Sequence, residues 1–162
     1  SDAGDVQRLA GEHEIADTTL NIPHPYKDGM AEDWISTHQE IFEQKRGITL
    51  AITIRNDGEL IGAIGLTGLL SGHQAELGYW IGKPYWSNGY CTEAGHALLE
   101  YAFTVLKLER IHSCHFKRNP ASGKVMIKLG MEYEGTRRKH VKKWGESEDL
   151  CVYGILREDW GK

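Results

Sequence analysis

The hydrophobic period of this chain changes abruptly between residues 76 and 105, and this change constrains the fold more than any other feature. The first part alternates as in a β-strand, with Leu77, Tyr79 and Ile81 on one face and polar or small residues between them. Pro84 ends the alternation, because proline cannot donate to a sheet ladder. After a turn of small residues, apolar side chains recur at helical spacing. The sequence therefore predicts a strand, a short loop and the N-terminus of a helix.

The loop of this unit contains Ser87, Asn88 and Gly89 directly before the helix. A helix N-terminus leaves its first backbone N–H groups without partners, and the helix dipole adds positive potential there. These properties suit a phosphate or pyrophosphate group. The simpler alternative is a plain strand-to-helix connection in which Gly89 only relieves a tight turn.

The composition limits the class of protein. The chain has 162 residues and 18.3 kDa, enough for one domain spanning residues 1–162 with its own core. Its net charge of −4 argues against general nucleic-acid binding. The three cysteines are too scattered and too few for a disulfide framework, which fits a reducing cytoplasm. No apolar run approaches the roughly 18 residues of a membrane span. We therefore expect a cytoplasmic protein that does not bind a membrane.

The other segments predict an α+β protein built on one mixed sheet. Two helices come first, then strands that include a hairpin around Asn56-Asp57-Gly58, and finally helices and strands that alternate. The expected helices are the segment through Val6, Leu9 and Ala10, capped by Ser1 and Asp2, then 28–46 ending at Gly47, the helix that runs to Lys107, and the one opened by Asn119-Pro120 with Ala121, Val125 and Leu129 facing inward. The expected strands are 48–55, 60–67, 76–81, 110–116, 131–136 and 149–156, with a charged loop between the last two.

Residues 78–94, with the sequence GYWIGKPYWSNGYCTEA, closely resemble the acetyl-coenzyme A loop of the GNAT N-acetyltransferases. Within that superfamily they resemble the branch of the ribosomal-protein N-terminal (Rim-type) acetyltransferases. Gly89 matches the glycine of the superfamily pattern, and Trp86 replaces its leading polar residue, as is usual in this branch. Cys91 replaces the final alanine or glycine, and it requires slightly more room where the backbone meets phosphate.

This resemblance implies the GNAT acyl-CoA N-acyltransferase fold, a mostly antiparallel mixed sheet flanked by helices. The family normally opens with a strand before the first helix, and that strand is apparently absent from this chain. The implied cosubstrate is acetyl-coenzyme A, with no metal. The residues implied to contact the coenzyme are Trp80, Ile81, Trp86, Ser87, Asn88, Gly89, Tyr90, Cys91, Thr92, Asn119, Ser122 and Lys124.

A second motif, Asn119-x-x-Ser122, lies seven residues before Leu129 and also resembles the family pattern. In relatives the asparagine holds amide groups of the coenzyme, and the serine hydroxyl lies near the thioester sulfur. Many GNAT enzymes have a tyrosine as general acid at the position of Met126, which cannot donate a proton. Ser122 is then the candidate donor to the sulfur. The alternatives are that Asn119 only caps the helix and that Ser122 is only a solvated polar residue.

The implied chemistry is direct attack of an amine on a thioester, for which a carboxylate can accept the amine proton. Glu76 is the first candidate base, because its strand should also polarise the acetyl carbonyl through backbone N–H groups. Glu76 pointing only to solvent is the alternative. The Rim-type branch often places a carboxylate at the position that is Val141 here, beside His140, so this sequence leaves the base open.

The acceptor is less well determined than the donor. The first hypothesis is the N-terminal α-amino group of a protein, such as a ribosomal protein, in a cleft between the segment 23–30 and the loop 137–146. The second is a small amine such as an amino acid, polyamine, dipeptide or drug, because a fold does not determine an acceptor. A module that binds acyl-coenzyme A without turnover, and more distantly a dinucleotide-binding domain, complete the alternatives. A homodimer is compatible with all of them.

Three further features have simpler readings. His112 and His115 should point to opposite faces of a strand, which makes a poor metal pair. Cys91 is expected to be a small buried residue rather than a nucleophile. The basic run 137–143, with Trp144 beside it, is usually a solvated loop, although it could contact an acidic acceptor or RNA.

Overall fold

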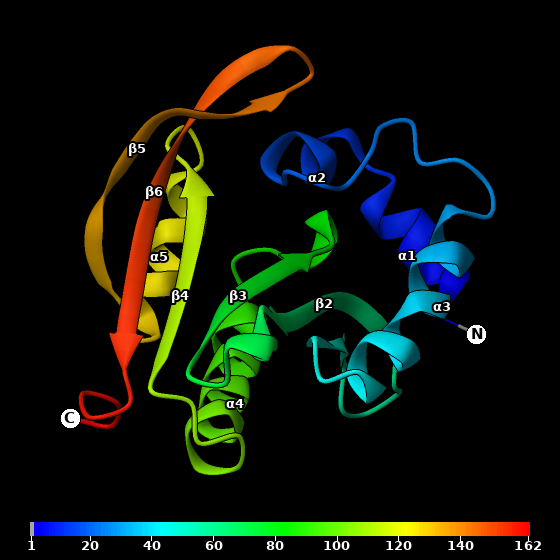
Figure 1. Cartoon of the computed structure of the whole chain (residues 1–162). Coiled ribbons are helices and arrows are strands. Elements are labelled where there is room, and N and C mark those ends of the chain that lie inside the picture. Colours follow the sequence, from blue (N-terminus) through cyan, green and yellow to red (C-terminus); the bar gives the residue numbers. More distant parts are fainter. Residues whose placement is uncertain (1) are drawn as a thin grey trace.

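The computed structural model describes residues 2–162 (Figure 1). Its α-helices are α1 (Ala3–Ala10), α2 (His13–Thr18), α3 (Met30–Glu43), α4 (Tyr90–Thr104) and α5 (Pro120–Lys128), with short 3₁₀ turns η1 (Leu69–Ser71) and η2 (Lys83–Tyr85). Its strands are β1 (Gly47–Thr53), β2 (Leu60–Thr67), β3 (Gln74–Ile81), β4 (Arg110–Phe116), β5 (Glu132–Lys143) and β6 (Glu146–Leu156). In the described part of the chain, no helix is long and apolar enough to cross a membrane.

The six strands form one mixed sheet in the order β1-β2-β3-β4-β6-β5. Every neighbouring pair is antiparallel except β3 and β4, which are parallel. The predicted mixed sheet and the predicted Asn-Asp-Gly hairpin are confirmed. Gly58 has a φ of +75°, the left-handed conformation that such a hairpin turn requires.

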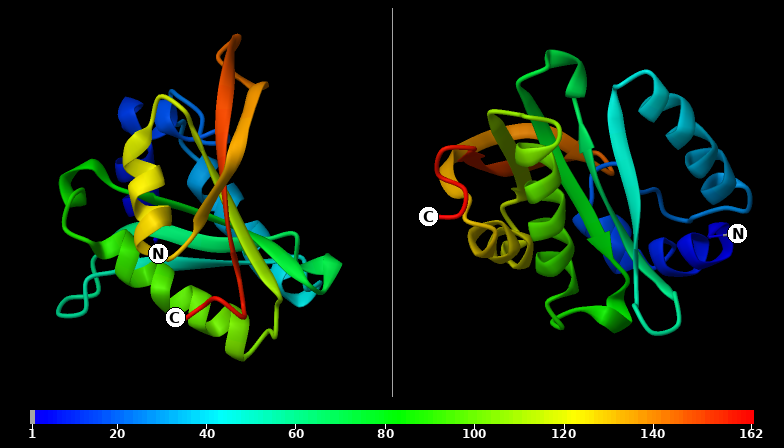
Figure 2. Two further views of the ribbon diagram at one scale, coloured as in Figure 1. Left: turned by 90° about the vertical axis from the view of Figure 1, so that its left-hand side faces the viewer. Right: turned by 90° about the horizontal axis from the view of Figure 1, so that it is seen from below.

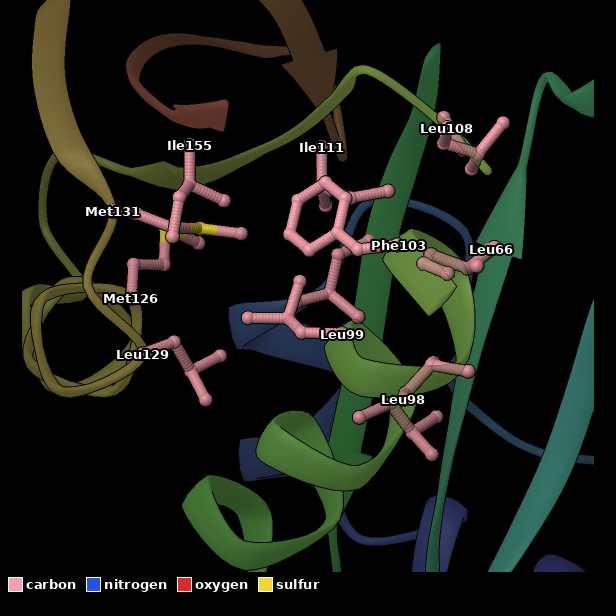
Figure 3. Packing of buried hydrophobic residues seen from close by; sticks show 14 of the residues in the cluster. Leu66, Leu98, Leu99, Phe103, Leu108, Ile111, Met126, Leu129, Met131 and Ile155 are labelled. Atoms are coloured by element: carbon pink, nitrogen blue, oxygen red, sulfur yellow. The ribbon is translucent and has the colours of Figure 1, made fainter. Parts of the chain in front are cut away.

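Helices cover both faces of the sheet (Figure 2). Each face has its own apolar cluster. The larger cluster lies between the sheet and α4 with α5, where Leu99, Phe103 and Ile111 are almost fully buried (Figure 3). The smaller cluster joins α1 and α3 to the opposite face, around Leu9 and Leu60. Because successive strand residues point to opposite faces, β3 contributes Leu77 to the first cluster and Trp80 to the second.

Several helix predictions need correction. The short helix α2 was not predicted, and the second predicted helix ends at Glu43 rather than Arg46, with the left-handed residue at Lys45 instead of Gly47. Asp2 occupies the cap position of α1 without a capping hydrogen bond from its side chain, and the predicted cap Ser1 lies outside the described residues.

The inward face of α5 also differs from the prediction. Gly123 and Met126 are buried there together with Leu129, whereas Ala121 is exposed. The reason is close packing on β4, because a Cβ at Gly123 would lie 2.6 Å from the His115 Nε2 atom.

The predicted charged loop 137–146 is instead the far end of a long β5–β6 hairpin, which turns at Trp144 and Gly145. β5 is an edge strand, so its exposed basic side chains, Arg137, Arg138, Lys139 and Lys142, reach solvent without breaking the sheet, whereas Lys143 is buried. The tip projects toward α2, where the Trp144 and His13 rings lie 5.2 Å apart (Figure 1). Trp144 therefore packs partly within the protein.

Candidate active site

The central feature of the site is a split between the parallel strands β3 and β4. Their pairing stops at Glu76 and His112, after which the two strands diverge (Figure 1). Ser113 Oγ donates to the Leu77 carbonyl at 2.7 Å, and Trp86 Nε1 donates to the Ile81 carbonyl at 2.7 Å. These two carbonyls therefore face the split. Backbone groups alternate between the edges of a strand, so the Tyr79 N–H and carbonyl face it too.

The loop that follows β3 is braced by its own side chains. Asn88 Nδ2 donates to the carbonyls of Tyr85 and Trp86, at 3.1 and 2.9 Å. Gly89 takes the cap position of α4 with a φ of +81° and offers no side chain to the first helical N–H groups. A Cβ built on Gly89 would meet nothing within 4 Å. The helix N-terminus is therefore open to an anion, which fits the phosphates of a coenzyme.

Three predicted coenzyme residues on this unit have side chains that point elsewhere. The Trp80 side chain lies on the α1–α3 face, and Ile81 is buried in the larger cluster. Only the main chain of Ile81 reaches the split. Burial raises the pKa of the Cys91 thiol to about 12, so this thiol stays protonated and fits a packing role.

The second motif brings Ser122 to the same split from α5. The Tyr79 hydroxyl lies 2.8 Å from Ser122 Oγ and donates to the Ser122 carbonyl at 3.0 Å. Burial raises the pKa of Tyr79 well above its usual range, so its hydroxyl stays neutral. Asn119 stands at the cap position of α5, but its side chain makes no capping hydrogen bond, contrary to the simplest alternative reading. Lys124 is exposed on the same helix.

Tyr79 is a site residue that the sequence interpretation placed only on a strand face. One signal pointed to it: a tyrosine on the inward face of a strand needs a hydrogen-bond partner for its hydroxyl. That partner lies 43 residues further along the chain, which local patterns do not show.

Glu76 lies at the point where the strands separate, on the opposite face of β3 from the Tyr79 side chain. Its carboxylate is partly exposed, accepts a weak hydrogen bond from Cys114 Sγ at 3.5 Å, and has one oxygen 4.0 Å from His112 Nε2. Burial lowers the pKa of His112 and raises the pKa of the Cys114 thiol to about 11. Glu76 therefore provides a carboxylate at the split on this face of β3. It lies beside the His112 imidazole, whose neutral form is favoured by burial.

One cavity of about 680 Å³ joins these groups, because Glu76, Tyr79 and Ser122 all line it. It lies between the sheet, helices α1 and α3, and the segment 18–23. Of the two walls expected for an acceptor cleft, the segment 23–30 contributes Pro23, Tyr26 and Met30 to the lining of this cavity, whereas residues 137–146 do not line it. Val141, at the position where Rim-type relatives often have a carboxylate, and the neighbouring His140 are in the hairpin and so lie outside the lining of the cavity.

The segment 18–23 is held against the hairpin from behind. Lys143 is buried, and its ammonium donates to the Ile22 carbonyl at 2.9 Å and to the Leu20 carbonyl at 3.3 Å. Arg118 bonds to Asp17 and Glu148 nearby. Within residues 2–162, no group of three His, Cys, Asp or Glu side chains could hold a metal ion.

The element order, the split sheet and the open helix N-terminus are those expected of an acetyltransferase of the GNAT type. Residues 1–132 match the family described as "Acetyltransferase (GNAT) domain", so the chain belongs to this family. It is therefore an acetyl-transferring enzyme, and membership of this family supports acetyl-coenzyme A as its donor.

Individual proteins agree with this assignment. The uncharacterized N-acetyltransferase YoaA of Bacillus subtilis (strain 168) is 36% identical over 124 residues, which make up 76% of this chain and 70% of YoaA. The ribosomal protein uS5-alanine N-acetyltransferase of Escherichia coli (strain K12) is 27% identical over 107 residues, 65% of this chain and 55% of that protein. The crystal structure of a GNAT-family acetyltransferase from Bacillus anthracis has a TM-score of 0.86 at 23% identity, covering 97% of this chain and 90% of that one, and it supports the fold.

Proposed function

We propose that this enzyme acetylates the N-terminal α-amino group of a protein, such as a ribosomal protein, by direct attack of the amine on acetyl-coenzyme A. The observation that carries the proposal is the shared cavity, in which a carboxylate and a hydrogen-bonded pair of hydroxyl groups meet at the split between β3 and β4. An acyl acceptor can approach from the α1–α3 face, whereas the open N-terminus of α4 belongs to the other face of the sheet.

The donor would be held mainly by backbone groups. The N–H groups from Asn88 to Thr92 lie at the open N-terminus of α4, and we assign the pyrophosphate to them. The side chain of Asn119, which does not cap α5, is assigned to the arm of the coenzyme. The exposed ammonium of Lys124 is assigned to the phosphates of the coenzyme. The edge of β3 at Tyr79 supplies an N–H for the thioester carbonyl oxygen.

Glu76 is assigned as the group that accepts the proton of the acceptor amine. An α-amino group has a pKa of about 8, whereas a lysine side chain has a pKa near 10.4, so a protein N-terminus needs less help to lose its proton. A partly exposed carboxylate can take that proton directly or through one water molecule.

Ser122 is assigned as the hydrogen-bond donor to the departing sulfur, with Tyr79 as its positioning residue. Tyr79 has one hydroxyl proton and two acceptors on Ser122. When Tyr79 donates to Ser122 Oγ, the Ser122 proton is free to point at the sulfur. Because its pKa is raised, the Tyr79 hydroxyl keeps its own proton. The thiol of coenzyme A has a pKa near 8.5, so the sulfur can leave as a thiolate that accepts a hydrogen bond, without taking a proton from the tyrosine.

A small amine is the second candidate acceptor, and one observation favours it. Tyr26, Met30 and Trp34 line the cavity and could enclose a compact molecule. The similarity to the uS5-alanine acetyltransferase supports the protein acceptor instead. A cytoplasmic setting, a homodimer and the absence of nucleic-acid binding stay predictions; the three free cysteines agree with the first.

Release of free thiol from acetyl-coenzyme A, measured against peptides and small amines, tests the proposal. Peptides with a free N-terminus should be acetylated, and the same peptides with a blocked N-terminus should not. Turnover of small amines with no turnover of peptides would favour the second candidate. Coenzyme binding without thiol release for any amine would leave only a binding module.

A further inference from the structure

The acceptor cavity has a marked charge bias. Among the described residues that line it, Glu76 and Asp33 are the carboxylates, and none is a lysine or an arginine. A cationic or neutral amine therefore meets no lysine or arginine in the lining that would repel it. An acceptor that carries a carboxylate or phosphate next to its amine would bring like charges together, which is unfavourable in a partly desolvated site.

Two cations behind the cavity wall, Lys143 and Arg118, are already engaged. Lys143 lies behind the segment 18–23 and donates to the Leu20 and Ile22 carbonyls. Arg118 is paired with Asp17 at 2.9 Å and with Glu148 at 2.7 Å. Both charges are thus committed to holding the wall in place and do not point at an acceptor anion.

The remainder of the wall is largely apolar. Trp34 from α3, Trp80 from β3 and Phe116 from β4 line it, with Ile48 from β1. A cavity of about 680 Å³ is also much larger than an amino group, so it has room for an apolar substituent beside the amine. Such a substituent would gain stabilisation by leaving water.

From these observations we infer that the acceptor is an amine with an apolar substituent and without an acidic group beside the reacting nitrogen. This inference rests on the proposed function and narrows it. The N-terminus of a peptide qualifies, because its first carboxyl is an uncharged amide. Uncharged or cationic aryl and alkyl amines qualify as well, whereas free amino acids and phosphorylated amines do not.

The test compares 2-phenylethylamine with L-phenylalanine, which differ by the α-carboxylate. Initial rates are measured over a range of pH and compared at equal concentrations of the unprotonated amine, so that basicity does not decide the result. We expect kcat/KM to be at least tenfold higher for 2-phenylethylamine. A similar preference is expected for L-phenylalanine amide over the free acid.

A charge-reversal variant links the preference to the cavity. Asp33 is exposed in the first turn of α3 and lines the cavity, whereas its neighbour Glu32 is exposed outside the lining. Asp33→Lys should reduce the amine-to-amino-acid ratio at least threefold, and the matched control Glu32→Lys should leave it unchanged.

The outcomes separate this inference from the proposed function. Equal or better use of L-phenylalanine by the wild-type enzyme, or an equal response to both lysine variants, would overturn the inference and leave acetyl transfer standing. No acetylation of any amine or peptide would instead count against the proposed function.

Discussion

The pair formed by Tyr79 and Ser122 gives the sharpest test of the proposed chemistry. Replacing Tyr79 by Phe removes the hydroxyl that lies 2.8 Å from Ser122 Oγ and leaves the ring in place. A hydrogen bond between neutral groups contributes about 0.5–1.5 kcal/mol. Since 1.4 kcal/mol corresponds to a factor of ten, Tyr79→Phe should lower kcat about two- to tenfold. The KM for acetyl-coenzyme A should change little.

Ser122→Ala should have a larger effect, on the order of ten- to a hundredfold in kcat, if its hydroxyl supports the departing sulfur. The decisive variant combines the two changes. If Tyr79 acts through the Ser122 hydroxyl, Tyr79→Phe should have almost no further effect on kcat once Ser122 is alanine.

A purely structural role for Tyr79 predicts a different result. Its hydroxyl also donates to the Ser122 carbonyl at 3.0 Å, and this contact survives in Ser122→Ala. Anchoring of α5 alone would therefore give the same loss of kcat in both backgrounds, and that outcome would refute the assigned role. Steady-state thiol release gives the rates, and thermal unfolding reports any loss of stability. Tyr85→Phe, whose hydroxyl bonds to the surface residue Glu59, is the matched control.

Three further predictions follow from the site and its scaffold. Gly89→Val should weaken acetyl-coenzyme A binding, measured by calorimetry, at least tenfold, about 1.4 kcal/mol. The control Gly58→Val, at a residue with a similar φ of +75° in a distant hairpin, should leave the affinity unchanged. Equal affinity of both folded variants for the coenzyme would argue against the assignment of the pyrophosphate to this loop. Glu76→Gln should reduce turnover most at low pH, where amine deprotonation limits the rate, with coenzyme affinity within a few-fold; an unchanged pH profile would remove Glu76 from the role of base. Arg110 lowers the pKa of Glu134, so this carboxylate should stabilise the fold above pH of about 4.5 and lose that contribution as the pH falls. Urea unfolding of Glu134→Gln should therefore show a deficit of at most about 1 kcal/mol at pH 7, since the pair is partly exposed, and a progressively smaller deficit as the pH falls below about 4.5; a deficit that does not depend on pH would contradict this.

Much of the fold follows from local pattern. The alternation in β1 to β4, the turn at Gly58 and the Asn119-Pro120 start of α5 predicted those elements within a few residues. Predictions failed where local signals are weak. Helix α2 has only six residues, too few for a clear hydrophobic period. The sequence of the hairpin tip predicts a charged loop, because a solvent-exposed edge strand tolerates the same charged side chains as a loop.

The sequence by itself determined the proposed donor side of this enzyme. The strand, the glycine-containing loop and the helix N-terminus are consecutive in the chain, so residue spacing suffices to place their backbone N–H groups together. The proposed acceptor side was decided only by the tertiary structure. Glu76, Tyr79 and Ser122 share a cavity because β3 and β4 stop pairing after Glu76 and α5 packs closely over β4 at Gly123. Both conditions depend on contacts between segments far apart in the chain, and no local pattern of residues encodes where two strands part.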